Sequence, residues 1–156
     1  MLTFSTTDWD SYEAAQRFSV EPVFPHFASQ IFAFSGIPRL YHAALRASRP
    51  DISSAPVIEW CRITLQSSTT LATWRQGFSQ FEAILQRAPG YWGHRVGFVV
   101  EEPMVFLVLI GWESIEAHMA WFKTGGGKQA VDFYIRGGTE SFEMVHVIPQ
   151  GPIPNS

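Results

Sequence analysis

Histidines are the residues of this chain best suited to chemistry, because neutral imidazole accepts or donates a proton near pH 7. His94 and His146 each stand in an apolar, strand-like stretch, and His118 lies in a helical one. Apolar surroundings lower the pKa of a histidine and keep it neutral as a base. A histidine on an apolar strand face is also commonly a core residue with one satisfied hydrogen bond. The candidate catalytic residues are His118, His94 and His146, with Tyr91 as a hydroxyl that could polarise or protonate a carbonyl.

The motifs of nucleotide, metal and acyl-transfer sites are missing from the sequence. The glycine run at 124–129 has Gln after its Lys, where a P-loop requires Ser or Thr. No Gly-x-Gly-x-x-Gly opens a helix, and no Gly-x-Ser-x-Gly elbow occurs. The histidines lack the spacing of paired metal ligands, and the single Cys61 excludes an internal disulfide and a cysteine-based zinc site. We therefore expect no cofactor and no metal.

The composition favours a binder of apolar molecules. Aromatic residues make up 15% of the chain, with 13 Phe and 6 Trp, and charged residues only 16%, below the roughly 25% usual for soluble domains. One core formed by 156 residues cannot enclose so many large rings, so some should line a cavity or an interface. This pattern predicts a site for an apolar or aromatic small molecule, an oligomer, or both.

Charge and hydropathy exclude two other classes of partner. The net charge of −3, with no local Lys/Arg cluster, argues against nucleic acid, since neutralising phosphates requires a basic face. The longest apolar run, 104–110, is too short to span a bilayer, and the N-terminal residues do not read as a signal peptide. We expect a soluble, cytoplasmic protein without a membrane partner.

Hydrophobic periodicity predicts an α+β domain over residues 57–148. Residues 70–88 carry apolar side chains at steps of three and four, which is typical of an amphipathic helix. Residues 104–112 are apolar on both faces, as in the central strand of a covered sheet. The alternation in 91–100 puts Trp92 on one face with His94, and Gly93 and Gly97 on the other, where a backbone could approach closely. Strands are expected at 57–65, 91–100, 104–112 and 142–148, and helices at 70–88, 113–122 and 128–135, with Thr-Gly-Gly-Gly at 124–127 interrupting the last two.

The first 47 residues echo the end of the chain. Trp-Asp-Ser-Tyr-Glu-Ala-Ala at 9–15 parallels Trp-Glu-Ser-Ile-Glu-Ala-His at 112–118. Each is preceded by a strand-like stretch, continues into an aromatic-rich helical segment, and ends in an extended run with a histidine, His42 or His146. We interpret residues 1–47 as a strand-helix-strand half-repeat; chance similarity in an N-terminal arm is the alternative. His26 and His42 belong to this segment and rank lower as catalysts. Residues 149–156 form a proline-rich tail.

The segment 89–122 contains Pro-Gly-Tyr-Trp-Gly-His-Arg-Val-Gly and then Gly-Trp-Glu-Ser-Ile-Glu-Ala-His, the latter at 111–118. These motifs, in this order of elements, resemble antibiotic biosynthesis monooxygenase-like domains of the dimeric α/β-barrel superfamily, and look closest to those of filamentous fungi. The resemblance covers residues 57–148. It implies a ferredoxin-like βαββαβ antiparallel sheet with helices on one face, and a homodimer in which two sheets close into a barrel.

The resemblance does not fix the reaction. Relatives include cofactor-free quinone-forming monooxygenases, polyketide cyclases, decarboxylases and haem-degrading enzymes. The Tyr and His of the plant-type cyclases align with Trp121 and Gly127, so that dyad is absent. Haem degraders use an Asn, and the only Asn in this chain is Asn155 in the tail.

Together these observations predict a cofactor-independent enzyme of secondary metabolism acting on an aromatic or polyketide-like substrate. The reaction would be proton transfer in a cyclisation, isomerisation or decarboxylation, with His118 or His94 as the base and Tyr91 or a second His stabilising the enolate. One alternative is a cofactor-free monooxygenase that oxidises an anthrone or hydroquinone to a quinone. The other is a non-catalytic dimeric binding or assembly module, with its own Trp and Phe side chains filling the pocket. The expected substrate-binding residues are Trp92, Phe98, Trp112, Trp121 and Phe122.

Overall fold

The computed structural model describes residues 9–35, 41–47, 52–136 and 138–149. Its contacts divide the chain into two compact units, Met1–His42 and Ala43–Ser156. The boundary lies before the strand at 43–47. The prediction from the sequence had placed these residues in the N-terminal segment. None of the described helices is both long enough and apolar enough to cross a membrane.

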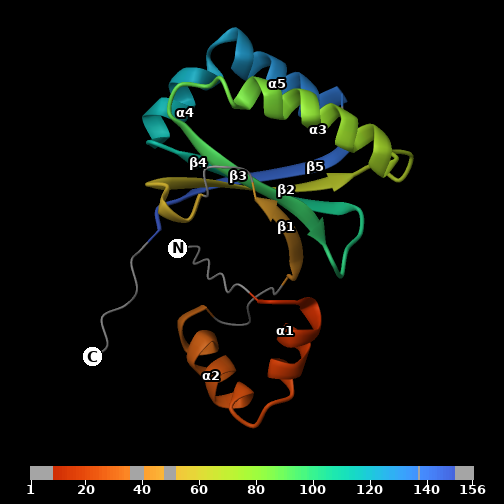
Figure 1. Ribbon diagram of the computed structural model, residues 1–156, viewed down its shortest axis with the longest axis vertical. Helices are drawn as coiled ribbons and strands as arrows, with labels where there is room; N and C mark the ends of the chain where they lie inside the picture. The colour runs from red at the N-terminus through yellow and green to blue at the C-terminus, as the bar shows by residue number, and fades with distance from the viewer. Residues whose placement is uncertain (1–8, 36–40, 48–51, 137, 150–156) are drawn as a thin grey trace. The chain divides into compact units, whose positions relative to one another are not determined.

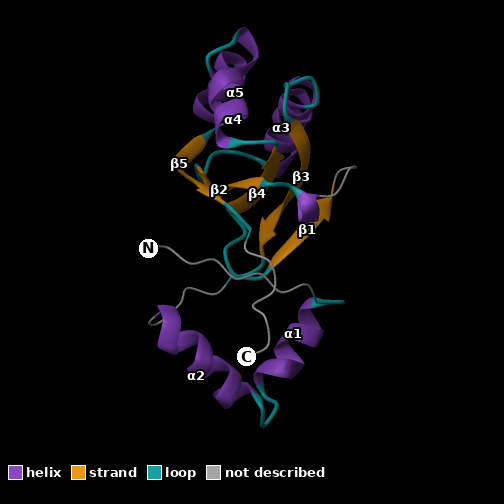
Figure 2. Cartoon of the chain, turned by 90° about the vertical axis from the view of Figure 1, so that its left-hand side faces the viewer, coloured by secondary structure: helices purple, strands orange, loops and turns teal. Residues whose placement is uncertain are grey.

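The larger unit is an antiparallel sheet covered by helices on one face. The strands are β1 (Ala43–Ala47), β2 (Val57–Leu65), β3 (Tyr91–Val99), β4 (Val105–Trp112) and β5 (Thr139–Val147), in the order β1-β3-β4-β2-β5 (Figure 1). The helices α3 (Leu71–Leu85), α4 (Ile115–Phe122) and α5 (Gly125–Arg136) lie on the same face, and a short 3-10 helix, η1 (Ile52–Ser54), contacts β3 and β4 (Figure 2). The α+β ferredoxin-like fold expected from the sequence is confirmed.

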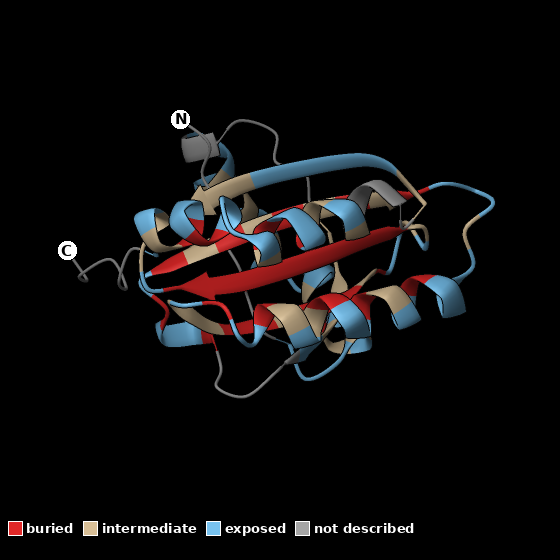
Figure 3. Ribbon diagram, turned by 90° about the horizontal axis from the view of Figure 1, so that it is seen from above, coloured by how far each residue is buried: buried red, intermediate tan, exposed pale blue. Residues whose placement is uncertain are grey.

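The core lies between the sheet and the helices. Every residue of β4 is buried, as expected for an apolar central strand, whereas most of β5 is exposed (Figure 3). The apolar stripe of α3 supplies Trp74, Phe78, Phe81 and Leu85 to this core. Thr70 caps the helix by accepting a hydrogen bond from the backbone N–H of Thr73.

The predicted start of α5, at residue 128, is wrong, since the helix begins at Gly125. Gly125, Gly126 and Gly127 form its first turn rather than an interruption. Thr124 makes this possible, since its carbonyl accepts from the N–H of Lys128 and its hydroxyl from Gly127. β5 also begins earlier than expected, because Thr139 pairs with Leu65 beyond a register shift in β2.

A bulge in β3 corrects the predicted facing of its side chains. Gly93 has a φ of 151° and pairs with Gly111, and the register shifts between Tyr91 and Gly93. His94 therefore faces the helices, while Trp92 packs on the opposite face of the sheet. The expectation that Trp92 and His94 share a face is wrong, because simple alternation does not hold across a bulge.

Close approach at Gly97 is confirmed. A Cβ placed there would lie 1.9 Å from the carbonyl oxygen of Ala44 on β1. Only glycine lets β1 pair with β3 at this separation.

The smaller unit contains α1 (Tyr12–Ser19) and α2 (Phe24–Ser35). The ring of Phe18 contacts those of Trp9, Phe24 and Phe27, with centroid distances of 5.2 to 5.8 Å. The helices α1 and α4 have 8 residues each, and α2 and α5 have 12 each. Ser11 and Ser114 cap α1 and α4 with nearly the same backbone angles. This correspondence favours the half-repeat, which stays a prediction, since its first strand would lie outside the described residues.

Candidate functional site

The four predicted catalytic residues come together as two pairs. His118 Nδ1 lies 2.8 Å from His146 Nε2, and the Tyr91 hydroxyl lies 2.7 Å from His94 Nδ1. Trp112 stands between the pairs, because its ring stacks on His118 at 4.6 Å and meets the edge of Tyr91 at 6.4 Å. Both pairs lie on the helix-covered face of the sheet.

The first pair is completed by a buried carboxylate, Glu59. Its side chain accepts a hydrogen bond of 2.8 Å from Trp112 Nε1–H and one of 3.3 Å from the Cys61 thiol. His118 Nε2 lies 3.6 Å from Glu59 Oε2. We call Glu59, His118 and His146 the His118 network. Its members run in a line from the core to the edge strand of the sheet.

Three elements position the His118 network. Glu59 on β2 is the register partner of His146 on β5, so the two side chains share one face. His118 reaches them from the first turns of α4, whose start is fixed when the Ser114 hydroxyl accepts from the N–H of Ala117. Glu59 and His118 are 5% and 3% exposed, whereas His146 is only partly buried. The network therefore opens toward solvent at His146.

Burial shifts the pKa of the acid and of the two histidines in opposite directions. It raises the pKa of Glu59, against the hydrogen bonds from Trp112 and Cys61, which lower it. It lowers the pKa of His118 to about 4, with the neighbouring His146 contributing in the same direction. Burial also lowers the pKa of His146. Both histidines are therefore neutral near pH 7, as a base requires.

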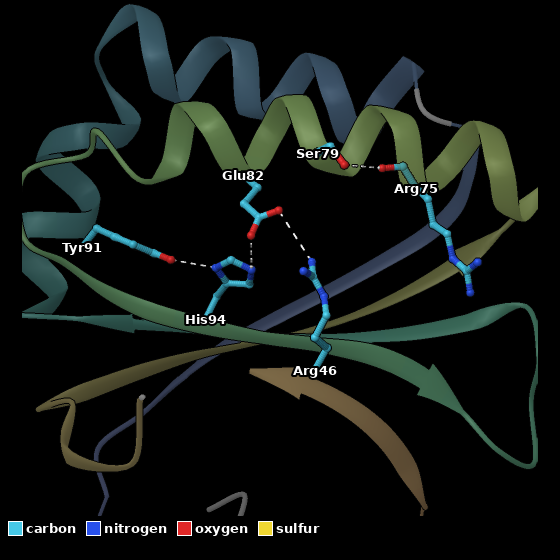
Figure 4. Close-up of polar contacts among 6 residues, drawn as sticks. All are labelled: Arg46, Arg75, Ser79, Glu82, Tyr91 and His94. Atoms are coloured by element: carbon cyan, nitrogen blue, oxygen red, sulfur yellow. Dashed lines mark hydrogen bonds and ion pairs between the residues drawn. The ribbon is translucent and has the colours of Figure 1, made fainter. Parts of the chain in front are cut away.

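The second pair extends to the sheet edge through charged residues (Figure 4). His94 Nε2 lies 3.3 Å from Glu82 Oε1 on α3, and Arg46 on β1 lies 3.6 Å from Glu82 Oε2. Burial lowers the pKa of His94; Glu82 raises it and Arg46 lowers it. We call Tyr91, His94, Glu82 and Arg46 the His94 network.

The His94 network has a preferred protonation pattern. A neutral imidazole has one N–H, and the carboxylate of Glu82 can only accept. The hydrogen of His94 therefore belongs on Nε2, and Nδ1 accepts from the Tyr91 hydroxyl. In this tautomer the Tyr91 hydroxyl donates its hydrogen to His94 Nδ1.

The predicted substrate-binding rings are dispersed. Trp121 lines a cavity of about 310 Å³ between the end of α3 and the α4–α5 turn, and Phe122 lines a hollow of about 550 Å³ on α4 and α5. Trp112 is fully buried, Phe98 packs on Phe106 at 3.8 Å, and Trp92 lies on the other face of the sheet. Neither of these two spaces is lined by a histidine of the two networks.

Aromatic side chains fill the layer where an apolar pocket was expected. Trp74 stacks on Phe106 at 3.7 Å and on Phe78 at 5.0 Å, and Phe81 stacks on Phe133 at 5.4 Å. These rings pack between α3, α5 and the sheet. Any access of substrate to the networks therefore has to come from the edges of this layer.

Sequence reasoning missed Glu59 and Glu82. The position of Glu59 could have been predicted from the sequence. In β2 it lies on the same face as Val57, Cys61 and Ile63, and this face is buried. Glu82 gave no such signal, because it is an ordinary charge near the end of a helix. Within the described residues, no group of three or more His, Cys, Asp or Glu side chains is arranged to hold a metal ion.

Comparison with known proteins supports the fold. No family model and no curated protein matches the sequence. Among solved structures, SnoaB from Streptomyces nogalater, a cofactor-independent oxygenase, aligns with a TM-score of 0.55 at 15% identity over 65% of this chain and 100% of its own. A protein from Bordetella bronchiseptica, assigned as an antibiotic biosynthesis monooxygenase, aligns with a TM-score of 0.53 at 17% identity over 63% of this chain and 99% of its own.

A third neighbour is a proposed monooxygenase from Lactobacillus acidophilus, with a TM-score of 0.59 at 11% identity. It covers 87% of this chain, which spans only 64% of that protein. The chain has the fold of antibiotic biosynthesis monooxygenase domains. At these identities the likeness concerns the fold, and the chemistry has to be argued from the residues.

The pKa of His118 predicts a stability difference between pH 7 and pH 5. The pKa of His118 is about 4 in the folded protein and about 6.5 in the unfolded chain. Below pH 6.5 the unfolded chain therefore binds a proton that the folded protein does not, and the free energy of unfolding decreases as the pH is lowered. At pH 5 this loss is about 2 kcal/mol for His118. In urea denaturation, the free energy of unfolding of wild type should therefore decrease from pH 7 to pH 5 by about 2 kcal/mol more than that of His118→Gln. An equal loss in both proteins would show that His118 titrates normally.

Proposed function

We propose that the protein is a cofactor-independent enzyme that abstracts a proton from an aromatic or polyketide-like substrate, with His146 as the base. The observation that carries this proposal is the order of three side chains, in which His146 lies 2.8 Å from His118, and His118 lies 3.6 Å from the buried Glu59. Such a chain lets the base at its open end pass a proton inward, away from the substrate.

The protonation pattern supports proton transfer in that direction. With its hydrogen on Nε2 toward Glu59, His118 accepts at Nδ1 from the Nε2–H of His146. This leaves the Nδ1 lone pair of His146 free to take a proton from substrate. The proton on His146 Nε2 then moves to His118 Nδ1. The proton on His118 Nε2 moves to the ionised Glu59 when the imidazole closes the 3.6 Å that separates the two groups. Because burial raises the pKa of Glu59 and lowers that of His118, the carboxylate holds the proton and the imidazole relays it.

The surface around His146 supports an apolar substrate. Phe142 and Met144 are on the same face of β5 as His146, yet they are 42% and 37% exposed. Phe122 on α4 is 43% exposed and meets the edge of the His118 ring at 6.2 Å. A planar apolar molecule could pack on these side chains with an acidic C–H near His146. Cyclisation, isomerisation and decarboxylation of a β-keto compound all use such a proton transfer.

Proton abstraction is testable with anthrone as the probe. Under nitrogen in D₂O, wild type should accelerate exchange of the C10 hydrogens of anthrone, followed by NMR. His146→Gln and Glu59→Gln should each lower the enzymatic rate by roughly 10²- to 10⁴-fold. His94→Gln, which alters a buried histidine outside the relay, should stay within about threefold of wild type once folding is checked by thermal denaturation. Loss in His94→Gln alone would transfer the base to the His94 network.

A second candidate is oxidation of an anthrone or hydroquinone by O₂ without a cofactor. It is favoured by the shared fold with SnoaB, a cofactor-independent oxygenase. The first step is the same, because a deprotonated anthrone reacts with oxygen more readily than the neutral molecule. If the protein is an oxygenase, anthrone should drive oxygen uptake in air, and His146→Gln should abolish it. Exchange under nitrogen without oxygen uptake in air would instead leave the proton-transfer reactions.

We propose that the protein is a homodimer formed through the helix-free face of the sheet. This face carries Ile58, Trp60, Trp92 and Leu109, and among the described residues of Ala43–Ser156 the element packed on it is η1. An apolar sheet face normally requires a second layer. Native mass spectrometry should give twice the 17.6 kDa of one chain, and Trp60→Lys should give one chain. A dimer without exchange or oxygen uptake would favour the non-catalytic assembly module.

A further inference from the structure

A cavity on the helix layer is separate from both histidine networks. It has a volume of about 310 Å³, at the lower end of the roughly 300 to 1,000 Å³ typical of small-molecule sites. We call it the Arg87 pocket. It is lined by Ile84, Arg87, Pro89, Trp121, Thr124, Gly126 and Gln129.

One of the residues that line the Arg87 pocket, Trp121, has an indole N–H without an acceptor among the described residues. Trp121 is only 7% exposed and packs against Trp112 at 5.3 Å. No described group accepts a hydrogen bond from its Nε1. This nitrogen lies 3.0 Å from where a Cβ of Gly126 would be, and Gly126 itself lines the pocket. A donor of a largely buried side chain that borders a cavity is a ready partner for an acceptor placed there.

The remaining polar groups of the pocket are also suited to an anion. No described carboxylate pairs with the Arg87 guanidinium, and none of the lining residues is acidic. The Gln129 side chain likewise makes no hydrogen bond within the described residues. Lys123 and Lys128 flank the α4–α5 turn and add positive charge locally, although the chain as a whole has a net charge of −3.

The N-terminus of α5 completes the set of donors. This 12-residue helix begins at Gly125, and the first N–H groups of a helix have no partner within it. Gly127 and Lys128 donate to Thr124, which leaves the N–H groups of Gly125 and Gly126. Gly126 is on the pocket wall, so the positive end of the helix dipole adds to the charge of Arg87.

We infer that the Arg87 pocket binds the carboxylate of a small organic acid. The carboxylate would accept from the Trp121 Nε1–H and the Gly126 N–H and would pair with Arg87. The apolar part of the acid would pack on Ile84, Pro89 and the face of Trp121. A single guanidinium and this apolar wall fit a monoanion with a hydrocarbon body better than inorganic phosphate. The inference stands apart from the proposed function, because it concerns binding and none of the relay residues lines the pocket.

Glycine at position 126 keeps this pocket open. A Cβ there would come within 3.0 Å of Trp121 Nε1 and 3.5 Å of Ile84, whereas a Cβ at Gly125 would have nothing within 4 Å. Gly126→Ala and Gly125→Ala make the same chemical change in the same helical turn. Only the first should obstruct the site, so the two form a matched pair.

Benzoate, with benzamide as its neutral analogue and sodium phosphate as the inorganic anion, tests the proposal on the full chain. Binding is followed by ¹H–¹⁵N NMR of the indole groups, with the Trp121 signal identified by its loss in Trp121→Phe. Benzoate should shift the Trp121 signal saturably, and benzamide should not. Arg87→Gln and Gly126→Ala should weaken benzoate binding by about tenfold or more, and Gly125→Ala should bind as wild type does.

Four outcomes would overturn the proposal. A Trp121 signal that stays unmoved by millimolar benzoate would mean that the pocket has no affinity for a carboxylate. Equal responses to benzoate and benzamide, or unchanged affinity in Gly126→Ala, would place binding elsewhere or make it uncharged. A response to phosphate but not to benzoate would replace the organic acid by an inorganic anion.

Discussion

The carboxylate of Glu59 inside the core is the constraint on which the site depends. A buried acid is unfavourable unless its oxygens are hydrogen bonded. Here Trp112 and Cys61 occupy the two oxygens at 2.8 and 3.3 Å, so the orientation of the Trp112 ring is fixed by a polar contact. That ring then stacks on His118, which sets the imidazole between Glu59 and His146. Three strands and one helix are thus tied together by a single acidic side chain.

Properties that repeat along an element could be predicted from the sequence. The apolar stripe of α3 and the two-sided burial of β4 depend on many residues, so no single side chain could reverse them. Single-residue events were not predictable in the same way. The bulge at Gly93 moved Trp92 to the other face, and Thr124 let three glycines begin α5. Both depend on local hydrogen bonding or backbone angles that hydrophobic periodicity does not report.

The candidate site shows the same division. His118, His146, Tyr91 and His94 were recognised from residue type and apolar surroundings, but their pairing depends on which strands are neighbours. Glu59 faces His146 because β2 and β5 are adjacent, and these strands lie at opposite ends of the domain in sequence. Glu82 could not be predicted for a related reason. Its role depends on Arg46, and Arg46 is on β1, which lies outside the segment that carried the family resemblance.

The two networks differ in their counter-charges, and this difference assigns their roles. Glu82 is paired with Arg46 near the surface, so its negative charge is balanced and it can hold the Nε2 hydrogen of His94 in place. No described cation pairs with Glu59, and burial favours its protonated form. One carboxylate therefore fixes a histidine, while the other can accept a proton through one. Since Trp112 separates them and donates only to Glu59, a proton entering at His146 has no described hydrogen-bonded route to Tyr91. The relay ends at Glu59, and regeneration of the base has to occur by return of that proton through His146, to the product or to solvent.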